Sequence, residues 1–399
     1  MPGDQTTDPA LARSRSPLLG VYKPAAPLFV RGEGSDLIAD SGTRYLDFTS
    51  GIAVNALGYG DPSVSAAIRA SLESGLIHTS NLFRTRQGEE LAGWLVENSP
   101  ADRVFFCNSG AEANEAAFKF ARRWAGEQGG SEKNEIIAFR GSFHGRTFGA
   151  LAATDRPAAQ EPFKPLMPGV RFSDLDSLSV KRLIRADRTA AVIIEPIQAE
   201  GGVLPVPDHF LRDLRDLCDE AGALLIFDEV QVGLGRTGRL WAHEASGVVP
   251  DMISLAKPLA GGLPMGAVLL TDRVADAIRP GDHATTFGGG PLVAAAALAV
   301  CRRIGDPAFL TEVRRKAQLL ADLLGGLALR NARVVAVRGA GLIWGVEIDG
   351  PAAPVIERAL QSGLLLCGAG QNVVRILPPL TIRDEEMARG VAILEGALG

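Results

Sequence analysis

A lysine and an aspartate that follow neighbouring predicted strands are the side chains best placed to carry chemistry. Asp228 directly follows the apolar run Leu224–Phe227, and Lys257 comes two residues after the next run, Met252–Leu255. An ionised carboxylate at the end of a buried strand is costly unless a cation faces it. A lysine among small apolar residues loses proton affinity and becomes an available amine. Taken singly, Asp228 also fits a turn cap, and Lys257 also fits a side chain that reaches solvent.

A candidate phosphate cradle follows a third apolar run, Val104–Cys107. Ser109 and Glu112 have the S-x-x-E spacing of a capping box, which predicts a helix that begins with Gly110 and Ala111. The free N–H groups and the positive dipole end of such a helix bind phosphate. A plain capped helix is the commoner meaning of this pattern, and the motif taken alone favours that meaning.

The acid, the amine and the cradle together describe a pyridoxal phosphate site. Ligands of open α/β sheets gather at the carboxyl ends of the strands, where all three features are expected to meet. Pyridoxal phosphate needs a lysine for its Schiff base, an acid that keeps the pyridine nitrogen protonated, and a phosphate anchor. The sequence therefore predicts this cofactor, with Lys257 and Asp228 as the catalytic residues.

The segment Gly233–Gly238 matches the dinucleotide fingerprint G-x-G-x-x-G, and Asp251 lies near the acidic position of that motif. Five residues separate the segment from the preceding apolar run, whereas the fingerprint requires a tight strand-to-helix turn. The residues that follow, Arg239–His243, make a poor helix, and Asp251 precedes a strand instead of ending one. The dehydrogenase interpretation is therefore rejected. The five histidines are scattered and form no HExxH motif, so no metal site is predicted.

Strand and helix patterns alternate through the middle of the chain, which predicts an α/β fold with a mostly parallel sheet covered on both faces. The predicted strands are Val104–Cys107, Ile136–Phe139, Ala191–Ile194, Leu224–Phe227, Met252–Leu255 and Ala267–Leu270. Helices are predicted over Ala111–Trp124, over Asp208–Gly222 with Asp and Gly as its end signals, and over the apolar run Leu292–Cys301.

After about residue 305 the pattern becomes that of a smaller α+β domain. It contains a long helix over Phe309–Leu329, strands at Val334–Val337, Ile343–Ile348, Leu364–Leu366 and Val373–Leu377, and a last helix from about Asp384. Strands at Leu28–Val30 and Tyr45–Phe48 are expected to join it. The predicted division is a mobile tail (1–16), an N-terminal segment packed with the small domain (17–60), a large cofactor-binding domain (61–304) and the small domain (305–399).

Composition and charge limit the location and the partners. A chain of 399 residues with 46% hydrophobic and 22% charged residues is globular and long enough for more than one domain. A net charge of −5 without a basic run disfavours nucleic acid and anionic membranes as partners. The absence of a spanning apolar run and of a secretion pattern predicts a soluble cytoplasmic protein. The four separated cysteines are predicted to be reduced core thiols: Cys107, Cys218, Cys301 and Cys367.

A series of short motifs follows a fixed order along the chain. They are Gly51–Asn55, Ser80–Phe83, Cys107–Glu115, Ser142–Thr147, Glu195–Gln198, Phe227–Gln231, Leu255–Lys257, Thr285–Gly289 and Arg375–Leu380. From about Leu28 to the C-terminus, this series resembles the class III (fold type I) pyridoxal phosphate aminotransferases. The resemblance implies the PLP-transferase fold type I, with a mostly parallel central sheet in a large domain and a smaller α+β domain.

The resemblance also implies a role for each residue that matches a family motif. Lys257 would form the Schiff base and carry the proton, and Asp228 would pair with the pyridine nitrogen. Other cofactor contacts would come from Gln231 at the ring hydroxyl oxygen, Phe143 stacked on the ring, Ser109, Gly110 and Ala111 at the phosphate, and Thr286 at the phosphate of the neighbouring subunit. Substrate contacts would come from Thr285, from Arg146 at a distant carboxylate, from Arg375 at the α-carboxylate of glutamate or 2-oxoglutarate, and from Glu200, which would neutralise Arg375 while the other substrate is bound.

Within the family, the resemblance is closest to members that act on N-acetylornithine. The expected reaction transfers the δ-amine of N-acetylornithine to 2-oxoglutarate, giving N-acetylglutamate semialdehyde and glutamate, as a step of arginine biosynthesis. The expected enzyme is a homodimer with shared active sites. The alternatives are another ω-amino donor (ornithine, 4-aminobutyrate or succinyl-diaminopimelate) and a pyridoxal phosphate aminomutase. Gly290, Ala199 and Arg84 depart from the family pattern, and Arg84 is expected near the substrate entrance.

Overall fold

The computed structural model describes residues 18–399, so the predicted tail (1–16) lies outside the described residues. A seven-stranded sheet of order β4-β12-β11-β10-β7-β5-β6 forms its centre. The strands are β4 (Arg103–Cys107), β5 (Glu135–Phe139), β6 (Val170–Ser173), β7 (Thr189–Ile194), β10 (Leu224–Asp228), β11 (Met252–Leu255) and β12 (Gly266–Leu270). Only β12 is antiparallel to its neighbours in this sheet, so the predicted mostly parallel sheet is confirmed. Six of these strands match predicted strands, and β6 was not predicted.

Helices cover both faces of the central sheet, and the strands alternate their side chains between them. On β10, Leu224 and Ile226 pack in the apolar cluster that contains α4 (Gly110–Gly129). Leu225 and Phe227 pack in a separate cluster with α8 (Asp208–Ala221). A strand buried on both faces needs a continuous apolar run, which explains the pattern seen in the sequence.

The C-terminal end signal predicted for α8 is confirmed, and the predicted N-terminal end signal is wrong. Gly222 follows its last residue in the left-handed conformation (φ 58°), as a C-terminal glycine does. At the start, Asp208 is already helical and Pro207 takes the cap position. The predicted buried helix at Leu292–Cys301 is α10 (Pro291–Ile304), which packs against α2 (Pro62–Glu73) and α3 (Arg86–Glu97). Shorter elements are α1 (Ser50–Ala53), α5 (Phe148–Ala152), α6 (Pro157–Gln160), α7 (Ser177–Leu183), α9 (Asp272–Ala275), β8 (Ile197–Gln198) and β9 (Leu204–Pro205).

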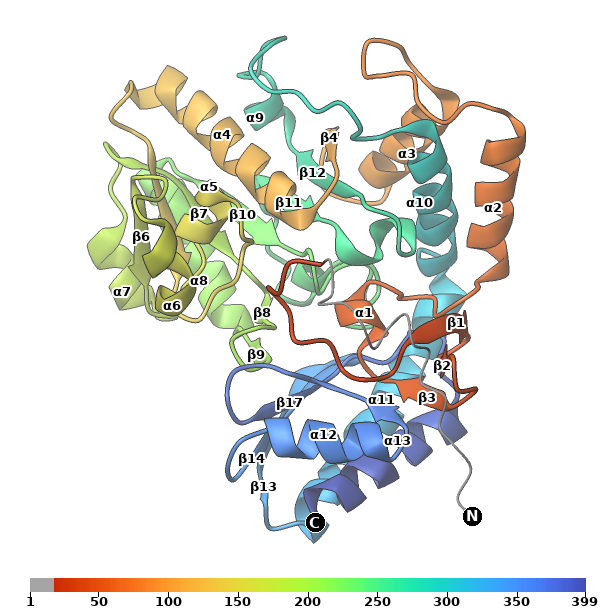
Figure 1. Cartoon of the computed structure of the whole chain (residues 1–399). Coiled ribbons are helices and arrows are strands. Elements are labelled where there is room, and N and C mark those ends of the chain that lie inside the picture. Colours follow the sequence, from red (N-terminus) through yellow and green to blue (C-terminus); the bar gives the residue numbers. More distant parts are fainter. Residues whose placement is uncertain (1–17) are drawn as a thin grey trace, which may run out of the picture.

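The C-terminal part forms a second layer of strands and helices. Its elements are α11 (Pro307–Arg330), β13 (Val334–Ala340), β14 (Ile343–Ile348), α12 (Ala353–Gln361), β15 (Leu364–Leu365), β16 (Cys367–Gly368), β17 (Val373–Ile376) and α13 (Asp384–Leu398). The N-terminal strands β1 (Phe29–Glu33), β2 (Asp36–Ala39) and β3 (Arg44–Asp47) form a sheet with β15, in which Leu46 lies opposite Leu364. Figure 1 shows β1–β3 beside the blue C-terminal elements. This pairing supports the predicted domain division, which stays a prediction.

The glycine-rich segment Gly233–Gly238 forms successive turns against the C-terminal part and opens no helix. Arg236, only 2% exposed, donates from Nη1 to the carbonyls of Leu342 (3.0 Å) and Pro378 (2.5 Å). A Cβ at Gly341 would lie 2.3 Å from the Arg236 carbonyl oxygen, so the turn of β13 and β14 fits this segment only with glycine. The motif is therefore a structural contact between two parts of the chain.

All four cysteines are free, and three of them are buried as predicted. Cys367 differs because it is partly exposed. In the part of the chain that the structure describes, no helix is long and apolar enough to cross a membrane.

Candidate active site

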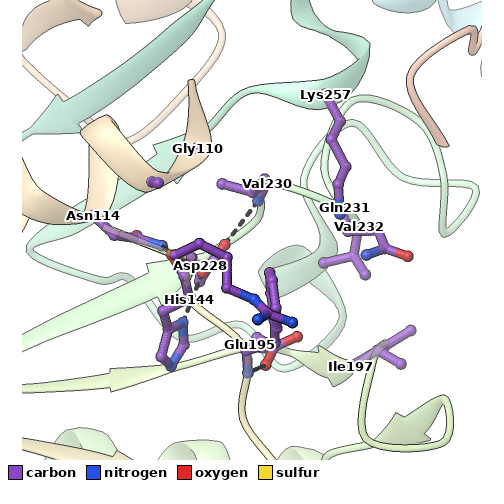
Figure 2. A pocket seen from close by; sticks show the side chains of 14 residues that line it. Gly110, Asn114, His144, Glu195, Ile197, Asp228, Val230, Gln231, Val232 and Lys257 are labelled. Atoms are coloured by element: carbon purple, nitrogen blue, oxygen red, sulfur yellow. Dashed lines mark hydrogen bonds and ion pairs between the residues drawn. The ribbon is translucent and has the colours of Figure 1, made fainter. Parts of the chain in front are cut away.

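A cavity of about 280 Å³ lies where β7 and β10 end and α4 begins (Figure 2). Seven of the predicted site residues line it: Gly110, Ala111, Phe143, Arg146, Asp228, Gln231 and Lys257. They come from segments far apart in sequence, and the sheet brings them together at the carboxyl ends of its strands, as expected for this class of fold.

The start of α4 presents unpaired backbone donors to the cavity. Ser109 caps the helix, and its Oγ accepts from the Glu112 N–H at 3.2 Å. The predicted capping box is only half formed, because the Glu112 carboxylate accepts from the Asn108 N–H (2.8 Å) and not from that of Ser109. No described residue accepts from the N–H groups of Gly110 and Ala111, which lie in the first turn. A Cβ on Gly110 would lie 2.6 Å from Val230 Cγ1, so only glycine fits beside Val230 at the start of this helix.

Asp228 is held at the floor of the cavity by three contacts. Its Oδ2 accepts from Asn114 Nδ2 at 2.8 Å and lies 2.7 Å from His144 Nδ1, and its Oδ1 accepts from the Val230 N–H at 3.0 Å. Asp228 is 4% exposed and still lines the cavity. These contacts fix the direction of the carboxylate, so its remaining lone pairs can accept from a protonated group in the cavity.

Three polar side chains that line the cavity have no predicted role: Asn114, His144 and Glu195. Asn114 lies one helical turn after Gly110, and that spacing of four was a usable signal. His144 is buried and its Nε2 has no protein partner among the described residues. Glu195 accepts from the Phe143 N–H at 2.8 Å, and burial raises the pKa of its carboxyl to about 7. No sequence signal placed Glu195 beside Phe143, because that contact depends on how the strands are ordered in the sheet.

Lys257 follows β11 by two residues and begins a short 3-10 helix, Lys257–Ala260. Figure 2 shows its side chain extending into the cavity, on the side where Gln231 lies. Burial lowers the pKa of the Lys257 amine to about 8, an effect that the nearby Glu200 carboxylate opposes. At pH 7 roughly a tenth of such an amine is neutral, a far larger share than for an ordinary lysine. This neutral fraction is what the predicted role of Lys257 as nucleophile and base requires.

Arg375 and Glu200 form an ion pair next to the cavity and do not line it. Arg375 Nη1 donates to Glu200 Oε1 at 2.5 Å and to Gln231 Oε1 at 2.9 Å. Burial acts to raise the pKa of the Glu200 carboxyl, but the Arg375 guanidinium outweighs it and the net pKa is lowered. The pair is therefore ionised at neutral pH, as the predicted neutralising role of Glu200 requires.

Thr285 and Thr286 lie outside this cavity. Thr285 Oγ1 accepts from Asn108 Nδ2 at 3.1 Å, one residue before the helix cap. Thr286 is exposed. Arg84, expected near the substrate entrance, forms an exposed ion pair with Glu89 at 2.8 Å and does not line the cavity of its own chain. The roles predicted for the two threonines stay predictions.

A buried amine, a fixed carboxylate and an anion cradle around one cavity are the features of a pyridoxal phosphate enzyme. Residues 21–398 match the family model of the class-III aminotransferases, and the chain belongs to this family. The predicted family, fold type and enzyme class are confirmed, and the cofactor is pyridoxal phosphate.

The relatives agree in overall reaction and differ in amino donor. An acetylornithine aminotransferase of Alnus glutinosa, named as mitochondrial, is 49% identical over 94% of this chain and 84% of its own. A succinylornithine transaminase of Salmonella paratyphi A is 43% identical over 94% of this chain and 92% of its own. The crystal structure of an N-acetylornithine aminotransferase from Stenotrophomonas maltophilia K279a is similar with a TM-score of 0.83 and 39% identity, covering 94% of this chain and 96% of its own.

The residues present fit pyridoxal phosphate. The unpaired N–H groups of Gly110 and Ala111 suit its phosphate, and the oriented carboxylate of Asp228 suits a protonated pyridine nitrogen. When bound, the cofactor supplies an aldehyde that reacts with amines and a ring that withdraws electrons from the carbon bearing the amine. Lys257 is the amine that lines the same cavity.

The rate at which the apo-protein binds the cofactor covalently is expected to follow the neutral fraction of the Lys257 amine as the pH changes. Because only the unprotonated amine attacks an aldehyde, the capture rate at Lys257 should rise with pH and level off above about pH 8. Borohydride reduction at timed intervals, followed by mass spectrometry of the Lys257 peptide, measures this rate. A short lysine peptide, with a pKa near 10.4, should still gain rate well above that pH. A Lys257 rate that keeps rising to pH 10 would contradict the depressed pKa.

Proposed function

We propose that this enzyme transfers the δ-amine of N-acetylornithine to 2-oxoglutarate, giving N-acetylglutamate semialdehyde and glutamate. The observation that carries the proposal is the closed Arg375–Glu200 pair beside an Arg146 that lies at the cavity with no carboxylate partner among the described residues. This arrangement offers one free guanidinium to a donor whose single carboxylate is distant from its reacting amine. The reaction is proposed to serve arginine biosynthesis in the cytoplasm, and fractionation of source cells tests that location.

Arg146 is the residue best placed to select the donor. It is exposed at the cavity, and its guanidinium carbon lies 5.7 Å from the centre of the Phe143 ring. The free α-ammonium of ornithine would be repelled by a guanidinium that no acid neutralises, whereas an acylated nitrogen carries no charge. This favours an acylated donor over ornithine. 4-Aminobutyrate has no acylated nitrogen, so it would fill less of the cavity beside Arg146 than an acylated donor.

Proton movement is assigned to Lys257. Once a substrate amine has displaced it, Lys257 is a free base within the cavity that can take a proton from the amine-bearing carbon and later return it. Asp228 would stabilise the positive charge of a protonated pyridine nitrogen, and Asn114 and His144 keep its carboxylate in place. Glu200 releases Arg375 only when a second carboxylate arrives, as with glutamate or 2-oxoglutarate.

A panel of amino donors tests the proposal. The holoenzyme is given each donor at equal concentration with 2-oxoglutarate, and glutamate formation is measured. N-acetylornithine should have the highest kcat/KM, and ornithine and 4-aminobutyrate should fall well below it. Equal or better use of ornithine would overturn the proposed donor. Turnover of the donor without 2-oxoglutarate and without net amine loss would indicate an aminomutase instead.

N-succinylornithine is a second candidate donor, favoured by the 43% identical relative of that name. Its longer acyl arm ends in an additional carboxylate, for which Arg146 is also available. Succinyl-diaminopimelate has a similar arm and belongs in the same panel. The ratio of kcat/KM between acetyl and succinyl donors decides between them.

Arg375→Ala is expected to damage one half-reaction selectively. A lost arginine–carboxylate pair costs about 2–5 kcal/mol, so the 2-oxoglutarate half-reaction should slow by roughly 30-fold or more. The acetylornithine half-reaction should suffer much less, because its donor does not need Arg375. Glu200→Ala should instead let glutamate compete better with acetylornithine. Stopped-flow absorbance of each isolated half-reaction measures both effects.

Arg333→Ala is the matched control, because among the described residues the Arg333 side chain hydrogen-bonds only the backbone carbonyls of Leu398 and Asp349, and Arg333 does not line the cavity. Its two half-reactions should remain close to those of the unchanged enzyme. Equal damage to both halves in Arg375→Ala would defeat the selective role.

We propose further that two chains share their active sites in a homodimer. Exposed apolar side chains gather on two loops that contact each other: Leu76, Ile77, Leu82, Phe83 and Phe287. The loops are joined by the His78–Phe287 ring contact (5.3 Å) and by Asn81 Nδ2, which donates to the Thr285 carbonyl at 2.6 Å. A group of exposed apolar side chains on adjoining loops is typical of an interface. Thr286 lies in this surface, which supports its predicted reach to the neighbouring phosphate.

Leu82→Asp combined with Phe83→Asp is expected to give monomers with weakened cofactor binding. These side chains are 86% and 70% exposed, so the changes cost the single chain little and place two charges in the proposed interface. Sedimentation velocity measures the assembly, and titration of the apo-protein measures cofactor affinity. Leu329→Asp is the control, because this 91% exposed residue on α11 lies outside both loops. A double variant that remains dimeric would place the interface elsewhere.

A further inference from the structure

Gln231 contacts both the cavity and the ion pair behind it. It is 6% exposed and lines the cavity with Lys257, and its Oε1 accepts from Arg375 Nη1 at 2.9 Å. The same Nη1 donates to Glu200 at 2.5 Å. Among the described residues, no other side chain that lines the cavity hydrogen-bonds Arg375. Any movement of the Arg375 guanidinium therefore acts on the cavity through Gln231.

The chemistry of the two groups fixes the orientation of the amide. A guanidinium only donates, so the Gln231 atom that faces Arg375 must be the oxygen. The amide nitrogen, with two N–H groups, is then the end that can donate to Glu200 or to an acceptor in the cavity. While Arg375 holds the oxygen, the donor end of Gln231 is directed; once Arg375 leaves, the amide is free to rotate.

A carboxylate that draws Arg375 away competes for the same Nη1 on which both contacts depend. Opening the Glu200 pair and releasing Gln231 are therefore one event and not two. We propose that Gln231 couples the Arg375–Glu200 pair to the cofactor, so that opening the pair weakens the hydrogen bond that Gln231 donates to the ring oxygen of bound pyridoxal phosphate. This inference rests on the proposed function of Arg375 and on the predicted contact of Gln231 with the ring oxygen, and it makes the electronic state of the cofactor depend on which substrate is bound.

The test uses the holoenzyme and glutarate, a dicarboxylate that has neither an amine nor a ketone and so cannot react. The pH dependence of the cofactor absorbance is recorded with and without glutarate. A donor lost from an anionic oxygen raises the proton affinity of the chromophore, so glutarate should move the titration midpoint upward by about 0.5 to 1 pH unit. Glu200→Gln should move it in the same direction without glutarate, because it frees Arg375.

Gln231→Met removes both polar ends at nearly constant volume and should abolish the glutarate shift. Glutarate binding itself, measured by competition with 2-oxoglutarate, should persist. Gln231→Glu keeps an acceptor for Arg375 and removes the donor, so it should also lose the shift and serves if the first variant binds cofactor poorly. Gln198→Met is the control, because Gln198 is also buried, donates to the Arg140 carbonyl and does not line the cavity.

The coupling is overturned if glutarate leaves the absorbance titration unchanged in the unaltered holoenzyme, or if Gln231→Met keeps the full shift. A shift lost in both Gln231 variants and kept in Gln198→Met supports it. Because glutarate is not an amino donor, these results do not depend on whether N-acetylornithine is the substrate. Failure of the donor panel and failure of the coupling are therefore distinguishable.

Discussion

Lys257→Ala is expected to fold and bind pyridoxal phosphate without a covalent bond, and to lose turnover by about 10²–10⁴-fold or more. Proton transfer by a positioned side chain contributes that factor alone, and this variant also lacks the amine that attaches the cofactor. The anion cradle at Gly110 and Ala111 and the carboxylate of Asp228 remain, so affinity for the cofactor should survive in part. Steady-state assays measure the turnover, and the cofactor absorbance together with borohydride reduction measures the lost bond.

Lys133→Ala is the matched control for this result. Lys133 is also buried and its pKa is also lowered by burial, but it donates to the carbonyls of Ala186 (2.8 Å) and Ala221 (3.2 Å), away from the cavity. Its loss should lower the thermal midpoint and leave the turnover of the folded protein nearly unchanged. Near-normal transamination by Lys257→Ala would refute the assignment of the site.

Asp228→Ala should lower kcat by about 10²–10³-fold with a smaller effect on KM. In its predicted role the carboxylate would stabilise a positive charge at the ring nitrogen, and this interaction would strengthen as the substrate carbon gives up its proton. His144 and Asn114 lose their shared partner, so cofactor affinity should also fall. Separate kcat and KM values measure the effect, and a raised KM at unchanged kcat would argue against this role.

Asp251→Ala is the matched control for Asp228→Ala, because Asp251 is a buried aspartate whose contacts lie away from the cavity. It accepts from Arg215 and Arg273, each at 2.9 Å, and from the Leu225 N–H at 2.8 Å, near the start of β10 and not at its end. Its removal should destabilise the protein and leave kcat of the folded enzyme intact. The two variants separate loss of fold from loss of chemistry.

The central sheet could be predicted because its strands are buried on both faces. A run such as Leu224–Phe227 has no polar position, so it is predicted as a strand whichever strands lie beside it in the sheet. The strand β6 was missed because Val170, Arg171 and Phe172 are only partly buried at the edge of the sheet, where the apolar run is interrupted. The reversed direction of β12 also depends on packing and left no mark in the residue pattern.

Site residues could be predicted where a local sequence pattern, such as a helix cap or a strand end, sets their position. Gly110 and Ala111 follow a helix cap, Asp228 ends a buried strand, and Lys257 comes two residues after another, so the sequence indicated each position separately. Glu195 was not, because it matters only through contact with the Phe143 backbone in another loop. The Glu112 side chain was also predicted with the wrong partner. It accepts from the Asn108 N–H, one residue earlier than the capping-box spacing implies, and the sequence pattern does not distinguish these two neighbouring donors.

The pairing of β3 with β15 has a consequence for how the chain folds. Leu46 and Leu364 are neighbours in one sheet, yet most of the polypeptide lies between them. Closing so long a loop is entropically costly, and contacts of high sequence separation form slowly. During synthesis, β3 leaves the ribosome long before β15, so the edge of β3 that pairs with β15 has no partner until β15 has been made. We therefore expect the nascent chain to expose a strand edge for most of its elongation time, which makes it dependent on chaperones and prone to aggregation before it is complete.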